Sequence, residues 1–186
     1  MKGKLAAFCL AVAAVALPHV LQAQDNADDL LKKVINRPPV TAWHLDGVSG
    51  KPNIYNDPAL PQGGKAVRVA VPGKGEHPWS IAASNPIDKP VKAGDNLVLA
   101  FWARLEKGEN GATSAVLPYN AVQMSADPYT ALFSGPVTIG PEWKMYEVKG
   151  QANRAYAAGQ LNVSIHLATA KQTIDLGPVF VLDMGP

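Results

Sequence analysis

The sequence contains a single cysteine, Cys9, which lies within an apolar run from Leu5 to Leu17. One thiol cannot close an intrachain disulfide, and it cannot supply a cysteine-based metal site. The chain that follows this run has no thiol with which to attack a substrate. Its stability must therefore come from the packing of its side chains.

A second long apolar segment is also missing. The first one follows Lys2 and Lys4 and ends at Pro18, shortly before the small residue Ala23. This run is too short to span a bilayer, and its layout is typical of a cleaved secretory signal. We expect cleavage after Ala23, which would give an exported protein, periplasmic or secreted, without membrane insertion.

The chain has no marked excess of either charge. It contains 17 Lys and Arg residues against 15 Asp and Glu residues, and two of the basic residues, Lys2 and Lys4, belong to the predicted signal. The remaining Lys and Arg residues are scattered singly. Nucleic-acid binding requires a clustered positive surface, so we expect no nucleic-acid partner.

Catalytic motifs are missing as well. The sequence has no Gly-x-Ser-x-Gly elbow and no Gly-x-x-x-x-Gly-Lys phosphate loop, and His44, His77 and His166 are isolated from one another. A glycosidase would need two carboxylates that flank the scissile bond. Most acidic residues after residue 75 cluster in the predicted turns; Glu147 and Asp175 are exceptions, and nothing else in the sequence joins these two into a pair. We therefore predict a protein that is not an enzyme. A hydrolase with an unrecognised carboxylate pair is the alternative.

After Val40, Gly and Pro divide the chain into short segments rich in Val, Leu, Ile and aromatic residues with period-two alternation. This pattern is typical of an antiparallel β-sandwich or barrel. No periodic segment after Val40 is long enough for a helix. The predicted strands lie near residues 41–46, 65–71, 79–84, 96–105, 112–124, 137–139, 142–152, 160–168 and 178–184.

The segment before the predicted sandwich has a different pattern. Residues 28–36 carry apolar side chains at positions 30, 31, 34 and 35 behind Asp28 and Asp29, and Pro38 and Pro39 follow. This predicts a short amphipathic helix. We expect a signal peptide over residues 1–23, a helix and Pro linker over 24–39, and a β-sandwich over 40–186.

The alternation also assigns side chains to the two faces of a strand. One row is predicted to face the core: Leu97, Leu99, Phe101 and Ala103 in one strand, and Leu161, Val163, Ile165 and Leu167 in another. The opposite row then contains Trp102 and Arg104 in the first strand, and Asn162, Ser164 and His166 in the second. A strand face with Trp and Arg is not typical of a plain solvent-exposed face.

Five short motifs occur in an order that resembles the family 4/9-type carbohydrate-binding modules, as attached to bacterial xylan-degrading enzymes. They are Pro78-Trp-Ser-Ile81, Lys92-Ala-Gly-Asp95 leading into Leu99-Ala-Phe-Trp-Ala-Arg104, Pro128-Tyr-Thr130, Gly140-Pro-Glu-Trp-Lys144 and Gln172-Thr-Ile-Asp-Leu-Gly-Pro178. The resemblance covers about residues 41 to 184. It implies an all-β, antiparallel jelly-roll sandwich of the galactose-binding-like type, which binds sugar on one sheet or at its rim.

The resemblance implies that Trp79, Arg104, Tyr129 and Gln172 are positions able to face a ligand, whereas Trp143 is expected in the core. A sugar ring has an apolar face and a polar edge, so a site needs aromatic platforms and polar side chains. The candidate ligand-binding residues are Trp79, Trp102, Arg104, Tyr119, Gln123, Tyr129, His166 and Gln172. The alternatives are that the aromatic residues fill the core and that Arg104 pairs with a carboxylate.

The family resemblance also implies a structural calcium ion away from the sugar site. Asp46 and Asp183 lie near the first and last predicted strands and are the candidate ligands, with two surface aspartates as the alternative reading. No other cofactor is expected. The predicted function is an exported, non-catalytic module that binds a polysaccharide or oligosaccharide, of plant type or from a cell surface. The alternative is a periplasmic or cell-surface jelly roll that binds a protein partner and no sugar.

Overall fold

The computed structural model describes residues 29–61 and 63–186. The predicted signal peptide over residues 1–23 lies outside the described residues. Residues 29–32 are helical, and Lys33–Pro186 form a compact unit of their own. The predicted helix over 28–36 ends at residue 32, because Val34 and Asn36 form β-bridges with Leu182 and Ile87. No helix among the described residues is long and apolar enough to cross a membrane.

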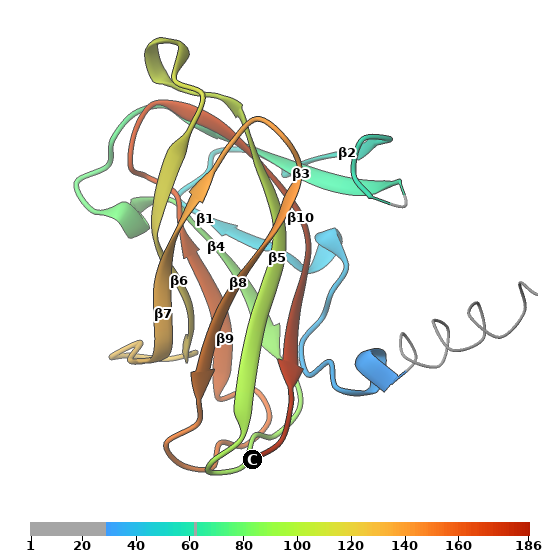
Figure 1. Ribbon diagram of the computed structural model, residues 1–186. Helices are drawn as coiled ribbons and strands as arrows, with labels where there is room; N and C mark the ends of the chain where they lie inside the picture. Colours follow the sequence, from blue (N-terminus) through green and yellow to red (C-terminus); the bar gives the residue numbers. More distant parts are fainter. Residues whose placement is uncertain (1–28, 62) are drawn as a thin grey trace, which may run out of the picture. The chain divides into compact units, whose positions relative to one another are not determined.

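Ten strands make up the described part of the compact unit, and Figure 1 shows their arrangement. They are β1 (His44–Asp46), β2 (Asn53–Asp57), β3 (Gly64–Val71), β4 (Ala82–Ile87), β5 (Asn96–Lys107), β6 (Ala115–Met124), β7 (Ala131–Ile139), β8 (Lys144–Gln151), β9 (Leu161–His166) and β10 (Gln172–Asp183). Three short 3₁₀ turns accompany them: η1 (Val40–Ala42), η2 (Pro78–Ser80) and η3 (Glu109–Gly111).

The strands form two five-stranded sheets. The first sheet has the order β1-β4-β9-β6-β7, the second sheet has the order β2-β3-β10-β5-β8, and every paired strand is antiparallel. The two sheets pack against each other over one hydrophobic core (Figure 1). This confirms the predicted all-β antiparallel sandwich. It also confirms that the chain after Val40 forms strands rather than α-helices within the described residues.

The core contains the side chains that the alternation assigned to it. On β5, Leu97, Leu99, Phe101 and Ala103 are fully buried, and on β9 so are Leu161, Val163 and Ile165. Burial of this many aliphatic and aromatic side chains is the main stabilising contribution in a chain whose single cysteine lies outside the described residues. The opposite rows of these two strands therefore form the outer faces of the second and first sheet.

Several strand segments were not predicted. The alternation of apolar residues did not indicate β2, residues 131–136 of β7 or residues 172–177 of β10. Gly135 and Pro136 interrupt the apolar pattern in β7, and Gly177 and Pro178 do so in β10, where the register with β5 shifts. Pro is tolerated at such an irregularity because it has no N–H to give to the ladder.

The segment after Lys33 belongs to the sandwich, upstream of the boundary expected at residue 40. The buried side chain of Asn36 donates from Nδ2 to Asn85 Oδ1 at 2.8 Å and accepts from the backbone N–H of Val181 at 2.7 Å. Asn85 in turn donates to the carbonyl of Arg37 at 2.9 Å. These bonds connect β4 of the first sheet to β10 of the second, and buried polar groups paired in this way fix one arrangement.

Candidate functional site

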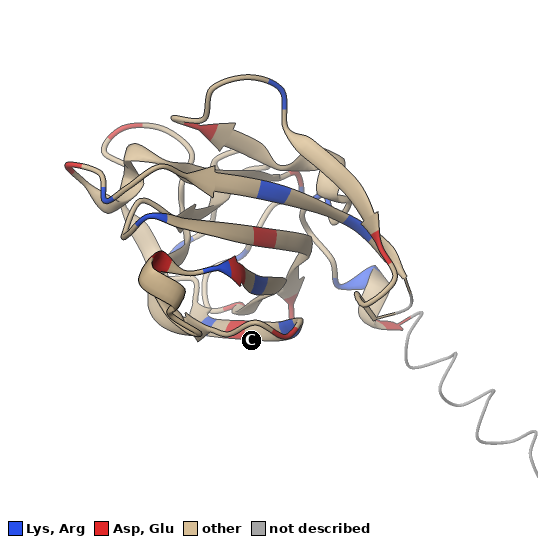
Figure 2. Ribbon diagram, turned by 90° about the horizontal axis from the view of Figure 1, so that it is seen from above, with Lys and Arg blue, Asp and Glu red and all other residues tan. Residues whose placement is uncertain are grey.

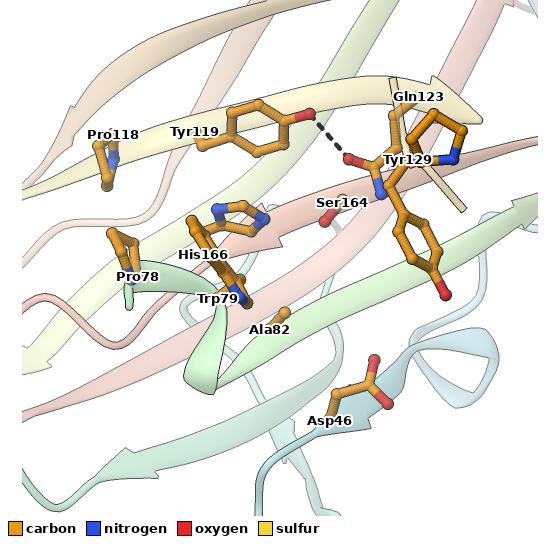
Figure 3. A pocket seen from close by; sticks show the side chains of 11 residues that line it. Asp46, Pro78, Trp79, Ala82, Pro118, Tyr119, Gln123, Tyr129, Ser164 and His166 are labelled. Atoms are coloured by element: carbon orange, nitrogen blue, oxygen red, sulfur yellow. Dashed lines mark hydrogen bonds between the residues drawn. The ribbon is translucent and has the colours of Figure 1, made fainter. Parts of the chain in front are cut away.

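A cavity of about 720 Å³ lies on the outer face of the first sheet (Figure 3). Strands β1, β4, β6 and β9 supply its floor, and η2 and the loop between β6 and β7 supply its walls. Its size is in the range of pockets that hold small molecules. The lining residues are Asp46, Pro78, Trp79, Ala82, Pro118, Tyr119, Gln123, Pro128, Tyr129, Ser164 and His166.

Three proline–aromatic pairs meet in this cavity: Pro78-Trp79, Pro118-Tyr119 and Pro128-Tyr129. Trp79 and Tyr129 are 56% and 53% exposed, which is unusual for such large side chains. The pairs come from three separate parts of the chain, and the fold brings them to one face. Exposed aromatic rings around a cavity supply flat apolar surfaces for a ligand.

Trp79 is held by the short turn η2. His77 stacks on one face of the indole, with ring centroids 4.4 Å apart and an angle of 9° between the planes. The His77 backbone N–H donates to Ser80 Oγ at 3.2 Å. With His77 covering one face of a ring that is still half exposed, the other face remains available to a ligand.

Two glycines allow η2 to lie against the sheet. A Cβ atom at Gly47 would lie 1.9 Å from the carbonyl oxygen of Ser80, and Gly47 has a φ of +73°. A Cβ atom at Gly75 would lie 2.8 Å from the Ser80 side chain. No side chain fits at such distances. The sequence therefore permits the close approach that fixes Trp79 beside the cavity.

Tyr119 reaches the outer face through an irregularity in β6. The pairing of β6 with β7 shifts register between Leu117 and Asn120, so Leu117 and Asn120 are both buried while Pro118 and Tyr119 both line the cavity. A bulge has this effect because its extra residue interrupts the alternation of faces. The Asn120 side chain donates to the carbonyls of Leu117 and Gly135, both at 2.9 Å, and thereby stabilises the bulge.

Tyr129 has a backbone conformation that is rare for an aromatic residue, with a φ of +53°. Its N–H donates to the carbonyl of Ala126 at 2.9 Å in the tight turn before β7. Left-handed conformations cost energy for residues other than Gly and Asn, and they concentrate at functional sites. This conformation positions the Tyr129 ring at the wall of the cavity opposite Trp79 (Figure 3).

Polar groups lie between the aromatic rings. The Tyr119 hydroxyl donates to Gln123 Oε1 at 2.8 Å, so the amide Nε2 of Gln123 is the group that can donate to a ligand (Figure 3). His166 stacks on Tyr119 with a centroid distance of 4.2 Å and meets Trp79 at 5.8 Å. Burial lowers the pKa of His166 to about 4, so its imidazole is neutral at neutral pH.

Five of the eight predicted ligand-binding residues line this cavity: Trp79, Tyr119, Gln123, Tyr129 and His166. The other three do not. Gln172 is buried, and its amide donates to the Leu167 carbonyl at 3.0 Å and to Thr169 Oγ1 at 2.9 Å. Trp102 and Arg104 belong to β5, whose outer row lies on the second sheet. These three residues therefore lie outside the candidate site.

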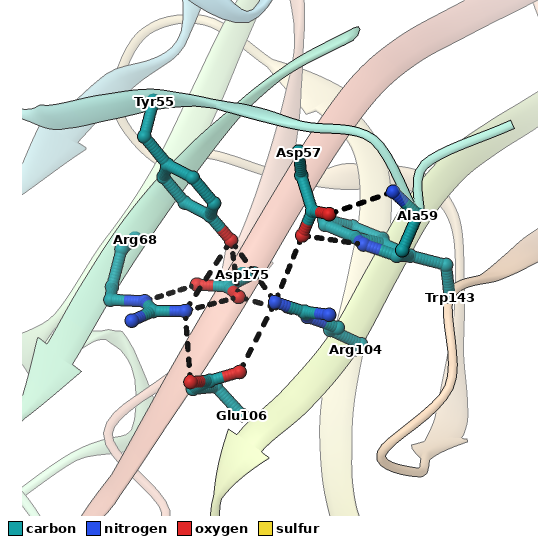
Figure 4. A network of polar contacts seen from close by, with 8 residues as sticks. All are labelled: Tyr55, Asp57, Ala59, Arg68, Arg104, Glu106, Trp143 and Asp175. Carbon is teal, nitrogen blue, oxygen red and sulfur yellow. Dashed lines mark hydrogen bonds and ion pairs between the residues drawn. The ribbon is translucent and has the colours of Figure 1, made fainter. Parts of the chain in front are cut away.

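Arg104 is part of a charged network on the second sheet (Figure 4). Its guanidinium contacts Asp175 at 3.0 Å, Asp57 at 2.9 Å and Glu106 at 3.1 Å. Arg68 contacts the same Asp175 at 2.8 Å and the same Glu106 at 3.1 Å. Acidic and basic segments lie on neighbouring strands in Figure 2. Arg104 therefore pairs with carboxylates, which was the alternative left open by the sequence.

The network is closed by two aromatic side chains. The Tyr55 hydroxyl donates to Asp175, and Trp143 Nε1 donates to Asp57 Oδ2 at 3.1 Å (Figure 4). Trp143 also lies under the Arg104 guanidinium, 5.1 Å from ring centroid to Cζ. It is partly exposed, so the expectation that it fills the core is wrong. Trp143 therefore contributes both a ring face and a hydrogen-bond donor to the network.

The network sets the charge states of its members. Burial alone would raise the pKa of Asp175, but the hydrogen bonds from Arg68 and the other donors outweigh it and hold the pKa below its usual range. Burial and the bond to Asp175 raise the pKa of Tyr55 to about 12, so this hydroxyl remains a donor. Since the members satisfy one another, the network is suited to holding β2, β3, β5 and β10 together rather than to binding a ligand.

The predicted calcium ligands lie in different places. Asp46 is on β1 and lines the cavity, whereas Asp183 is at the end of β10 in the second sheet and accepts from the backbone N–H of Gly185 at 2.9 Å. Among the described residues, no group of three or more His, Cys, Asp or Glu side chains is placed to hold a metal ion. The carboxylate pair expected for calcium is therefore not brought together.

Ser164 and Asp46 line the cavity without having been singled out as sugar-binding residues. A signal for both was present in the sequence. Period two places Ser164 beside His166 on β9, and pairing of β1 with β4 and of β4 with β9 then aligns Asp46, Ala82 and His166. The pairing partners could not be read from the sequence, so this alignment was missed.

No protein-family model and no curated protein matches this chain. Similarity to solved structures is clear at the level of the fold. The second N-terminal cellulose-binding domain of Cellulomonas fimi β-1,4-glucanase C superposes with a TM-score of 0.61 at 20% sequence identity, over 82% of this chain and 95% of that one. The CBM22-1 xylan-binding domain of Paenibacillus barcinonensis Xyn10C gives 0.51 at 13% identity, over 83% and 93%.

Some structural neighbours are modules of longer enzymes. The arabinose-bound α-L-arabinofuranosidase MgGH51 superposes with a TM-score of 0.54 at 17% identity, over 82% of this chain but only 26% of that chain. At these identities the comparisons establish the fold and no more. The chain therefore has the jelly-roll fold of carbohydrate-binding modules.

Proposed function

We propose that this protein is an exported, non-catalytic carbohydrate-binding module whose ligand lies in the cavity on the first sheet. The observation that carries this proposal is the meeting of Pro78-Trp79, Pro118-Tyr119 and Pro128-Tyr129 in one cavity. Sugar rings stack on exposed aromatic faces through their axial C–H groups, and Trp79 and Tyr129 present such faces. The ligand class is a plant-type or cell-surface polysaccharide.

Polar groups of the cavity fit the edge of a sugar ring. The Gln123 amide donates, and the neutral imidazole of His166 and the hydroxyl of Ser164 supply further contacts. Two platforms and a few polar groups on an open sheet face bury little surface, so the affinity for a single oligosaccharide should be weak.

Three finer features belong to the same proposal. The family 4/9-type motifs and their association with xylan-degrading enzymes favour a xylan or a related plant polysaccharide. The cellulose-binding and xylan-binding neighbours share the fold and support a polymeric ligand of this kind. Export rests on the signal-like N-terminus, and the binding domain is the unit that starts at Lys33.

Affinity electrophoresis of the purified protein against xylans, arabinoxylan, β-glucans, pectins and mannan tests the proposal, with and without a chelator. We expect at least one polysaccharide to retard the wild-type protein and to lose this effect in Tyr129→Ala. Lys149→Ala, on the second sheet, is the control, and the polysaccharide should retard it as much as wild type, each measured against its own mobility in a gel without polysaccharide. Absence of retardation across the whole panel would favour the alternative, a jelly roll that binds a protein partner.

A further inference from the structure

The cavity has a single formal charge. Among the described residues that line it, Asp46 is the one acidic side chain, and there is no Lys or Arg. His166 adds no positive charge at neutral pH because burial keeps its imidazole neutral. The remaining lining groups are aromatic, proline, amide, hydroxyl and alanine side chains. A charged ligand in this cavity would therefore meet one charged lining side chain, the carboxylate of Asp46.

Asp46 points into the cavity from the edge strand β1. In Figure 3 its carboxylate lies on the side of the cavity that holds the Tyr129 hydroxyl, across the floor from Trp79. His44 Nε2 contacts Asp46 Oδ1 at 3.0 Å, which leaves Oδ2 for a ligand. The Asp46 side chain is 55% exposed, so a ligand can reach it without moving the sheet. A carboxylate beside two aromatic platforms matches a sugar with a positively charged substituent.

We propose that Asp46 makes this cavity selective by charge: it favours saccharides that carry an ammonium group, such as glucosamine polymers, and rejects those that carry carboxylates, such as uronic acid polymers. The inference rests on the proposed function, since it assigns a specificity to the same cavity. Stacking on Trp79 and Tyr129 would bind the ring of any of these sugars equally. The difference in affinity among these sugars therefore comes from the substituent that faces Asp46.

The size of the effect follows from the exposure of the site. Two unit charges about 4 Å apart in a solvent-exposed setting interact by roughly 1 kcal/mol, which is about fivefold in affinity. The interaction has the opposite sign for a carboxylate on the sugar. Screening by salt should reduce both differences.

Three trisaccharides with one backbone test the proposal: cellotriose, the β-1,4-linked glucosamine trimer, and the β-1,4-linked glucuronic acid trimer. Calorimetry at pH 6 and low salt should give an affinity about fivefold higher for the glucosamine trimer than for cellotriose, and lower for the glucuronic acid trimer. Asp46→Asn should remove these differences while cellotriose binding stays within about twofold of wild type. Glu147→Gln, on the exposed part of β8, is the matched control and should keep the wild-type order.

The outcomes separate the two proposals. Binding of all three trisaccharides with equal affinity, or an unchanged order in Asp46→Asn, would overturn the role of Asp46 and leave the sugar site intact. If none of the three trisaccharides binds and no polysaccharide of the panel retards the protein, both the proposed function and this inference are overturned. Melting temperatures of Asp46→Asn and Glu147→Gln close to wild type would show that both variants are folded.

Discussion

The outer faces of the two sheets differ in how their polar and aromatic side chains are used. On the first sheet, Trp79 and Tyr129 are half exposed and the cavity between them contains few internal polar contacts. On the second sheet, Arg68 and Arg104 are bound by Asp175 and other carboxylates, with Trp143 and Tyr55 completing the network. The first face has aromatic and polar groups that remain free to contact a ligand. On the second face, the charged groups are already paired with one another.

This difference shows why residue type alone does not identify a binding face. Trp102 and Arg104 point away from the core as predicted, and they have the chemistry of a sugar site. The neighbours of Arg104 determine its role. Its guanidinium makes three close carboxylate contacts, so few of its N–H groups can donate to a sugar hydroxyl. Unsatisfied donors and exposed rings are the features that distinguish the first sheet.

The largest change is expected in Asp175→Asn, which should lose stability without losing polysaccharide binding. Asp175→Asn removes the buried charge that two arginines share, and breaking such a pair costs about 3 kcal/mol. For a domain of this size that lowers the melting temperature by roughly 10 °C, while polysaccharide binding at low temperature should be unchanged. Asp88→Asn, which breaks an exposed pair with Arg37, is the control and should cost less than about 1 kcal/mol. A loss of binding in folded Asp175→Asn would mean that the two faces are not independent.

Acid should remove the contribution of Asp175 to stability. The pKa of Asp175 is lowered in the folded state, so its contribution to stability is present above the unfolded-state pKa of about 3.9 and is lost as the pH falls through the lower folded value. We expect the difference in melting temperature between wild type and Asp175→Asn to be constant above about pH 5 and to shrink below about pH 4. A difference that stays constant down to pH 3 would contradict the assigned charge state.

A smaller effect is expected when the wall of the cavity is moved. Gly47→Ala places a Cβ atom against the carbonyl of Ser80 and should displace η2 with Trp79. We expect polysaccharide affinity to fall about tenfold, equivalent to ~1.4 kcal/mol. Gly50→Ala is a matched control, because Gly50 also has a positive φ, of +88°, but has no atom within 4 Å of the added Cβ. Equal losses in both variants would show that backbone strain, not the position of Trp79, is responsible.

The smallest expected effect is the response of binding to pH. Because the pKa of His166 is lowered to about 4 by burial, sugar affinity should be flat from about pH 5 to pH 8. Calorimetry with a neutral oligosaccharide measures this directly. A step in affinity near pH 6.5, the ordinary value for histidine, that persists in His44→Asn and His77→Asn would contradict the burial of His166 in the ligand-binding state.

Much of the fold followed from the alternation of apolar residues. It predicted the core rows of β5 and β9 and the outward direction of His166, because period two leaves only one assignment for a strand with one buried face. Three of the cavity aromatics, Trp79, Tyr119 and Tyr129, each follow a Pro, and this local signal favours exposure over a place in a core strand. These inferences depend on neighbouring residues within a short segment.

The rest depended on contacts between distant residues. Strand β2 is polar, and what holds it is the pairing with β3 and the bond from Tyr55 to Asp175, which lies 120 residues away. The bridges of Val34 and Asn36 to β10 and β4 are likewise invisible in a local pattern. Whether Arg104 faces a ligand or a carboxylate could be decided only once its neighbours on β10 and β2 were known.

A comparison of Trp79→Ala with Trp102→Ala shows which sheet holds the sugar, because each variant removes one tryptophan from the outer face of one sheet. Calorimetry with an oligosaccharide of the polysaccharide that retards the wild-type protein supplies the measurement. We predict that Trp79→Ala loses about thirtyfold or more in affinity, the loss expected for an aromatic anchor, and that Trp102→Ala binds like wild type. Loss of binding in Trp102→Ala with full affinity in Trp79→Ala would place the sugar on the second sheet and contradict the proposed site.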